Sequence, residues 1–133
     1  MNKIEHIGIA VRDLKAAGRL YEQLLNTHIY KTEEVAAEGV KTAFLQTAPN
    51  KVELLEALSA DSPIAKFIDK KGEGIHHIAF EVDDIKAEME RLKSQGFVLL
   101  SDEPKPGADN KLVCFVHPKS VGGVLVELVQ ERK

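Results

Sequence analysis

An internal repeat constrains this chain more than any other feature of its sequence. Residues 4–25 read IEHIGIAVRDLKAAGRLYEQLL, and residues 75–96 read IHHIAFEVDDIKAEMERLKSQG. The two segments align without a gap, so that His77 corresponds to His6 at an offset of 71 residues. Since a repeated supersecondary unit dictates the architecture of a chain, we expect two modules of the same fold.

Each copy of the repeat has the same expected order of elements. It begins with alternating polar and apolar residues, which predict a β-strand, and continues with apolar residues at the helical period. Three apolar segments separated by turn-forming residues follow and predict three further strands. These segments are HIYKTEEV, GVKTAFLQT and KVELLEAL in the first copy, and FVLLSDE, KLVCFVHP and GVLVELVQ in the second. Each copy is therefore predicted to be a β-α-β-β-β module.

The segment DSPIAKFIDKKGEG joins the two copies and is predicted to be a connecting helix. Ser62 is its expected N-cap, Pro63 takes the first helical position and Gly72 ends it. We predict an α+β fold with a single domain over residues 1–133. Repeat one occupies about 1–60, the connecting helix about 61–72 and repeat two about 73–133. The mixed sheets of the two modules are expected to curl around a central cleft, where a ligand would bind.

Only one of the two adjacent histidines in the second copy is in phase with His6. Residues two apart in a strand share a face. His6 shares its face with Gly8, and His77 shares its face with Ala79, so small residues leave space beside both histidines. His76 has the opposite phase, and we interpret it as a capping or hydrogen-bonded structural histidine.

The last predicted strand of each copy contains a carboxylate in the local sequence V-E-L, Glu53 in the first and Glu127 in the second. An acidic side chain in an apolar strand is costly to bury unless it is paired or binds a cation. Taken singly, each could also point into solvent from a half-exposed strand. Because two histidines and two carboxylates occupy corresponding positions, we favour one metal site formed by His6, Glu53, His77 and Glu127. Two nitrogen and two oxygen ligands suit a divalent ion such as cobalt, nickel, zinc, manganese or iron.

Composition excludes several other classes of protein. With 44% hydrophobic and 29% charged residues, the chain has the composition of a compact domain. Its net charge of −3 argues against nucleic-acid and anionic-membrane partners, which usually need an excess of Lys and Arg. The first residues lack the apolar stretch of a signal peptide, so we expect a cytoplasmic protein. Cys114, the single cysteine, lies in the apolar run LVCFV and is expected to be a buried hydrophobe.

These motifs resemble the vicinal-oxygen-chelate (glyoxalase/bleomycin resistance/dioxygenase) superfamily and, within it, the methylmalonyl-CoA epimerases. The resemblance extends over essentially the whole chain, and DSPIAKFI and HPKSVGGVLVEL are the segments most similar to the epimerases in particular. It implies a glyoxalase-like fold around a metal-binding cleft, and an isomerase that epimerises methylmalonyl-CoA through an enolate. Among metals it favours cobalt, with zinc, nickel or manganese as alternatives. It further implies a homodimer with a small acyl-CoA substrate.

The resemblance also implies site roles, and two positions depart from it. His6, Glu53, His77 and Glu127 are the implied metal ligands, with Glu127 also an acid/base and Glu53 its candidate counterpart for the second proton transfer. Some epimerases have Gln where this chain has Glu53, and some have an additional carboxylate where this chain has Thr42. The second acid/base is therefore open between Glu38 and Glu53.

Other functions share parts of this pattern. A glyoxalase I-like lyase, acting on a glutathione hemithioacetal, would use the same four-ligand site and is the main alternative. An extradiol dioxygenase needs only two histidines and one carboxylate on iron, and a drug-sequestering relative needs no metal. Lys105, Lys111 and Lys119 are candidates for holding the phosphates of an anionic ligand, although ordinary surface lysines would explain them as well.

Overall fold

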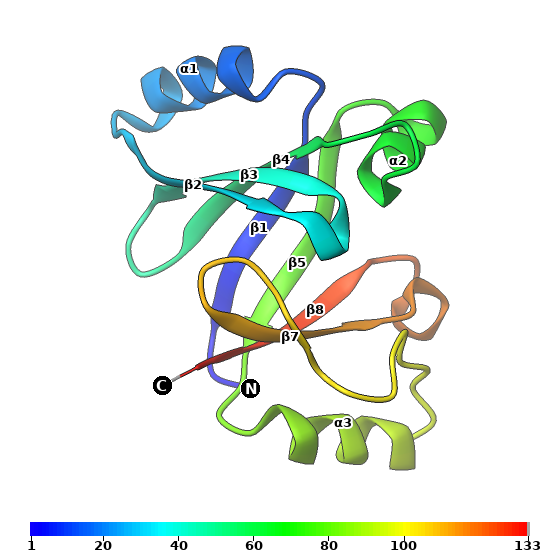
Figure 1. The fold of residues 1–133 in the computed structure, drawn as a ribbon. Coiled ribbons are helices and arrows are strands. Elements are labelled where there is room, and N and C mark those ends of the chain that lie inside the picture. Colours follow the sequence, from blue (N-terminus) through cyan, green and yellow to red (C-terminus); the bar gives the residue numbers. More distant parts are fainter. Residues whose placement is uncertain (133) are drawn as a thin grey trace. The chain divides into compact units, whose positions relative to one another are not determined.

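The computed structural model describes residues 1–132, and two compact units make up this part of the chain. The first unit is His6–His76, and the second consists of Met1–Glu5 together with the segment that begins at His77. The first unit contains the helices α1 and α2, and the second contains α3 (Figure 1). That the whole chain is one domain, with the modules enclosing a cleft, stays a prediction.

The elements follow the order expected from the repeat. The first module contains β1 (Ile4–Ala10), α1 (Leu14–Leu25), β2 (Ile29–Val35), the short 3₁₀ helix η1 (Ala36–Glu38), β3 (Val40–Gln46) and β4 (Lys51–Ala57). After α2 (Pro63–Lys71), the second module contains β5 (Gly74–Glu81), α3 (Ile85–Ser94), β6 (Lys105–Pro106), β7 (Lys111–Val116), the 3₁₀ helix η2 (Pro118–Val121) and β8 (Val126–Glu131). The predicted α+β class and the β-α-β-β-β order are confirmed in both modules.

The two modules also have the same strand topology. The strands of the first are ordered β2-β3-β4-β1, and those of the second are ordered β6-β7-β8-β5. In each module the first strand is parallel to the last, and the remaining neighbours are antiparallel. Parallel strands need a long crossover connection. In each module, the helix and the two middle strands form this connection.

The start of each module's helix is fixed in the same way. The aspartate that precedes the helix accepts hydrogen bonds from backbone amides of the first turn. The first helical residue then donates its own amide to a side chain of the module's last strand, Leu14 to Glu56 Oε1 at 2.8 Å and Ile85 to Gln130 Oε1 at 2.7 Å. The four N-terminal amides of a helix have no partner within the helix, so these contacts satisfy part of that need.

Helices cover both faces of the first unit's sheet, but different parts of it. α1 packs on one face through Leu14, against a cluster that includes Leu45 and Leu54. α2 packs on the other through Ile64 and Ile68, against the group Ala10, Val40 and Leu55. In the second unit, α3 buries its apolar side against Cys114, Val116 and Leu128. His6 on β1 and its register partner Lys51 on β4 are not part of the apolar cluster that packs against α2.

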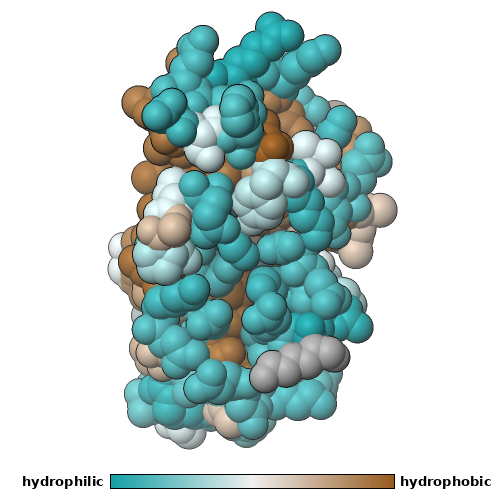
Figure 2. Space-filling view, turned by 90° about the vertical axis from the view of Figure 1, so that its left-hand side faces the viewer, coloured by the Kyte–Doolittle hydropathy of each residue, from teal (hydrophilic) through white to brown (hydrophobic). Residues whose placement is uncertain are grey.

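The connecting helix α2 has the predicted boundaries. Ser62 Oγ accepts a hydrogen bond from the amide of Ile64 at 3.1 Å, and Pro63 occupies the first helical position. Gly72 follows the last turn with φ of +78°, a conformation that favours glycine. Across the described residues, every helix is too short or too polar to span a lipid bilayer. On the face shown in Figure 2, hydrophilic side chains predominate.

The predicted strand at FVLLSDE is wrong. This segment contributes only one isolated bridge, Leu99 to Val116, and the edge strand β6 is the later pair Lys105–Pro106. Its other hydrogen bonds are irregular, for example from the amide of Val98 to Ser120 Oγ. Pro104 and Pro106 cannot donate a backbone hydrogen bond, in keeping with an edge strand of only two residues. Apolar composition alone therefore predicted a regular strand where the structure has a single bridge.

Core packing in the second unit gives a first testable prediction. Leu128 on β8 is fully buried, whereas Leu24 on α1 is 70% exposed. Leu128→Ala should lower the free energy of unfolding by about 2–5 kcal/mol, because the cavity cannot fully collapse. Leu24→Ala should change it by less than about 0.5 kcal/mol. Urea denaturation of both variants measures the difference, and equal effects would contradict the packing described here.

Candidate functional site

The first unit places His6 and Glu53 together on one sheet face. Gly8 is the register partner of Glu53 across the parallel β1–β4 pair, and His6 lies two residues before Gly8, on the same face. The His6 Nε2 atom is 3.2 Å from Glu53 Oε1. Both residues are buried, at 6% and 5% exposure. Two ionisable side chains are thus buried together in a region where isolated charges would be costly.

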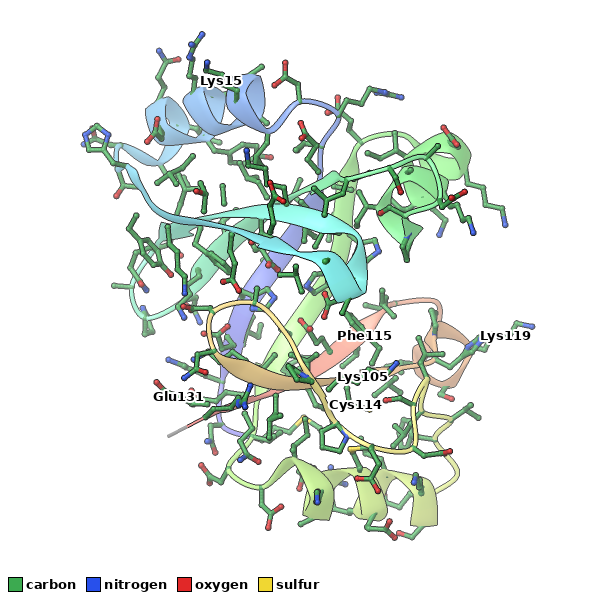
Figure 3. All side chains as sticks on the ribbon, in the orientation of Figure 1. Lys15, Lys105, Cys114, Phe115, Lys119 and Glu131 are labelled. Carbon is green, nitrogen blue, oxygen red and sulfur yellow. The ribbon has the colours of Figure 1, made fainter. Side chains whose placement is uncertain are left out.

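The second unit repeats this arrangement with His77 and Glu127. Ala79 is the register partner of Glu127 across the parallel β5–β8 pair, two residues after His77. The His77 Nε2 atom is 3.2 Å from Glu127 Oε1, and both residues are buried. The ring of Phe115 on β7, labelled in Figure 3, meets the imidazole of His77 edge-on at 5.7 Å between centroids. The prediction that His77, and not His76, is in phase with the first module agrees with this pairing.

The donor chemistry of the two pairs fits a divalent metal ion. Buried histidine and carboxylate side chains are usual ligands for first-row metals. Two ligand atoms that lie about 2.1 Å from one ion are separated by 3.2 Å when the angle between them is roughly 100°. This angle lies between the octahedral and tetrahedral values. The separation in each pair is therefore compatible with two ligands of one ion, while a shared four-ligand site stays a prediction.

The phenylalanines opposite the two carboxylates were not identified from the sequence. Phe44 on β3 is the register partner of Glu53, and Phe115 on β7 is the register partner of Glu127. Each antiparallel partner presents its aromatic ring on the face that carries the histidine–carboxylate pair. An apolar neighbour excludes water and strengthens electrostatic interactions at the pair. The signal was present, since both of these strands contain a phenylalanine at the equivalent position of the repeat.

The other histidines lie in three different surroundings. His76 packs edge-on against Phe67, with ring centroids 4.9 Å apart. His117 caps η2, where its Nδ1 accepts a hydrogen bond from the amide of Lys119 at 3.1 Å. The side chain of His28 is 95% exposed and lies 3.6 Å from Glu22.

Thr42 and Glu38, the two positions considered for the second acid/base besides Glu53, differ in burial. Thr42 on β3 is fully buried, and its Oγ1 has no hydrogen-bond partner among the described residues. Glu38 is half-buried in η1, beyond the end of β2. A catalytic role for Glu38 or Glu53 stays a prediction.

Three lysines were candidates for an anionic ligand. Lys111 is buried, with its Nζ 4.0 Å from Glu131, and is the least accessible of the three. Lys119 projects outward from η2, and Lys105 is exposed on β6 (Figure 3). Lys105 is the register partner of Val113 and so lies on the sheet face of Phe115, whose side chain is two residues away.

The cysteine is buried, as predicted. Cys114 is only 2% exposed, and burial raises the pKa of its thiol above the ordinary value. A nearby Ser101 hydroxyl, 3.7 Å from the sulfur, opposes this rise in pKa without overcoming it. The thiol is therefore protonated near neutral pH and is a poor nucleophile.

Comparison with known proteins decides the family. The profile of the Glyoxalase/Bleomycin resistance protein/Dioxygenase superfamily matches residues 5–115. This chain belongs to that superfamily. Members of the superfamily typically bind a divalent metal ion, in agreement with the buried histidine–carboxylate pairs. The family resemblance expected from the sequence motifs is confirmed.

Within the superfamily, the chain is similar to epimerases over nearly its full length. It is 44% identical to the ethylmalonyl-CoA/methylmalonyl-CoA epimerase of Cereibacter sphaeroides, covering 98% of both chains. The crystal structure of methylmalonyl-CoA epimerase from Mycobacterium tuberculosis has a TM-score of 0.94 at 37% identity, covering 98% of this chain and 88% of that one. A variant of the Streptomyces coelicolor methylmalonyl-CoA epimerase, solved with 2-nitronate-propionyl-CoA, has a TM-score of 0.95 at 36% identity and covers 100% and 99%.

The lyase alternative has much weaker support among superfamily members. A probable lactoylglutathione lyase of Vibrio cholerae is 24% identical over 132 residues, covering 99% of this chain and 93% of the lyase. The epimerases are more similar by 12 percentage points or more. The comparisons thus favour the epimerases over the glyoxalase I-like lyases, as the sequence motifs predicted.

Proposed function

We propose that this chain is a metal-dependent epimerase that interconverts the 2R and 2S forms of methylmalonyl-CoA. The observation that carries the proposal is its similarity to methylmalonyl-CoA epimerases across nearly the whole chain. A buried histidine–carboxylate pair in each module provides the chemistry that the reaction needs. A structure of a relative with 2-nitronate-propionyl-CoA supports a small acyl-CoA substrate for this chain as well.

His6, Glu53, His77 and Glu127 would hold the metal ion in one shared site. Such an ion would supply Lewis-acid stabilisation of the negative charge that develops on the substrate, which commonly contributes several kcal/mol. The burial of all four side chains keeps bulk water away from these ligands. Cobalt is our choice of metal, with zinc, nickel and manganese as the alternatives.

Glu127 is the first acid/base of the proposed reaction. The α-carbon of methylmalonyl-CoA lies between two carbonyl groups, so removal of its proton gives an enolate. The carboxylate of Glu127 accepts this proton, and a second group returns a proton to the opposite face. The sequence offers Glu38 and Glu53, the latter the equivalent of Glu127 in the other module, as candidates for this second group. A homodimeric state and a cytoplasmic location stay predictions.

Proton NMR of methylmalonyl-CoA in deuterated water tests the function directly. The purified protein should remove the methine signal of the substrate, because each enolate takes up deuterium from solvent. Prior chelation should stop the exchange, and reconstitution with cobalt or zinc should restore it. Absence of exchange in the reconstituted protein would reject the substrate but leave the superfamily assignment intact, and lyase activity on a glutathione hemithioacetal would then be measured.

A further inference from the structure

Epimerisation requires two proton-carrying groups, because the proton leaves one face of a planar enolate and returns to the other. This inference therefore rests on the proposed function. Glu53 and Glu127 each have an oxygen 3.2 Å from an imidazole nitrogen, and both are expected to hold the metal. A second acid/base that is not tied to the ion would be freer to take up and release a proton.

We propose that Glu33 on β2 is this second acid/base. In the antiparallel β2–β3 pair, Glu33 is the register partner of Thr42, and residues paired in this way present their side chains on the same face. Phe44 lies two residues from Thr42 and is the register partner of Glu53 across β3–β4. Glu33 therefore extends from the sheet face that carries Glu53 and its histidine partner.

The burial pattern of β2 supports this orientation. Glu33 and its neighbours Lys31 and Val35 on the same face are half-buried, whereas Thr32 and Glu34 on the other face are exposed. The side chain of Glu33 is 31% exposed, so a substrate can reach it. Lys31 Nζ lies 3.6 Å from Glu33 Oε1, close enough to orient the carboxylate without burying it.

Thr42, the residue paired with Glu33, has an unsatisfied hydroxyl. Its small side chain lies between Glu33 on β2 and Leu55 on β4. Thr42 Oγ1 is fully buried without a hydrogen-bond partner among residues 1–132, which is rare for a buried polar atom. An unsatisfied hydroxyl on this face is what a site built for a polar ligand would present.

The strand order separates Glu33 from the ligand candidate Glu53. The two residues lie two strands apart, so their backbones are separated by roughly 10 Å across the sheet. This distance prevents the two carboxylates from pairing directly. Glu38, the other candidate from the sequence, lies in η1 and belongs to no strand of this sheet.

The proton balance of the step is simple. The carboxylate of Glu127 accepts the α-proton and becomes a carboxylic acid as the C–H bond breaks. The carboxylic acid of Glu33 donates its proton to the opposite face of the enolate, forming the new C–H bond and leaving a carboxylate. The reverse reaction exchanges the two roles, and no oxidant, reductant or co-reactant is needed.

The test uses the metal-loaded protein and each pure epimer of methylmalonyl-CoA in deuterated water. Glu33→Gln should lower the rate of epimerisation by roughly a hundredfold or more. Deuterium exchange should persist for the epimer whose proton goes to Glu127 and should be lost for the other. Glu34→Gln, one residue away on the opposite face, is the matched control and should behave like the parent protein.

A second variant distinguishes a proton-transfer role from a structural one. Adding Thr42→Glu to Glu33→Gln moves the carboxylate to the paired position on β3, and should restore part of the lost epimerisation. Unchanged epimerisation in Glu33→Gln, or an equal loss of exchange from both epimers, would overturn the assignment of Glu33. If the parent protein itself exchanges neither epimer, the proposed function fails instead, so the two failures are distinguishable.

Discussion

Replacing His77 with alanine should remove the bound metal and lower epimerisation by about a thousandfold or more, since the ion is worth several kcal/mol of enolate stabilisation. The imidazole of His77 is buried, with its Nε2 atom 3.2 Å from Glu127 Oε1, and alanine offers no ligand atom in its place. Metal content measured by atomic emission and exchange measured by NMR would both fall.

His76→Ala is the matched control, because it removes the adjacent imidazole from the same strand. That ring packs on Phe67, and its loss should cost only about 0.5–1.5 kcal/mol of stability. Metal content and exchange should remain near those of the parent protein. Thermal melting of both variants separates misfolding from loss of the site, and His77→Gln provides a milder change if the alanine variant is unfolded. Equal metal content in the two alanine variants would contradict the role of His77.

The repeat explains why so much of the fold could be predicted. A 71-residue offset that aligned the two histidines also implied equal modules, and the alternation of residues then fixed which histidine shares a face with Ala79. The helical period and the capping residues are local features of the sequence. Both ends of α2 could therefore be predicted to the exact residue. The strand predicted at FVLLSDE was wrong because pairing at a sheet edge is a tertiary property that apolar content alone does not determine.

The neighbours of the site were harder to predict, because strand register is not a local property. The β2–β3 pair contains a bulge between Ile29 and Lys31, which shifts the register of all the following pairs. A shift of one residue would have placed Glu34, and not Glu33, opposite Thr42. The sequence therefore indicated the histidine–carboxylate pairs, which repeat, but not the carboxylate on the edge strand, which has no acidic counterpart in the second module.

The second large effect should come from Glu127→Gln. The amide retains an oxygen that can bind a metal ion but cannot take up a proton near neutral pH, so metal content should stay near normal. Epimerisation should fall by roughly a thousandfold, within the range expected for loss of a general acid/base. Glu131→Gln, on the same strand with a 66% exposed side chain, is the control and should have little effect.

Comparison with Glu53→Gln distinguishes proton transfer by Glu127 from metal binding by Glu127, because the two histidine–carboxylate pairs have the same separation. Both carboxylates lie 3.2 Å from their histidines, so a purely structural or metal-holding role predicts equal losses for the two glutamine variants. If Glu127 and Glu33 transfer the protons and Glu53 only holds the ion, Glu53→Gln should retain most of the epimerisation while Glu127→Gln does not. Equal and large losses with normal metal content would instead assign the second proton transfer to Glu53. Retained activity in Glu127→Gln would show that its carboxylate only holds the ion.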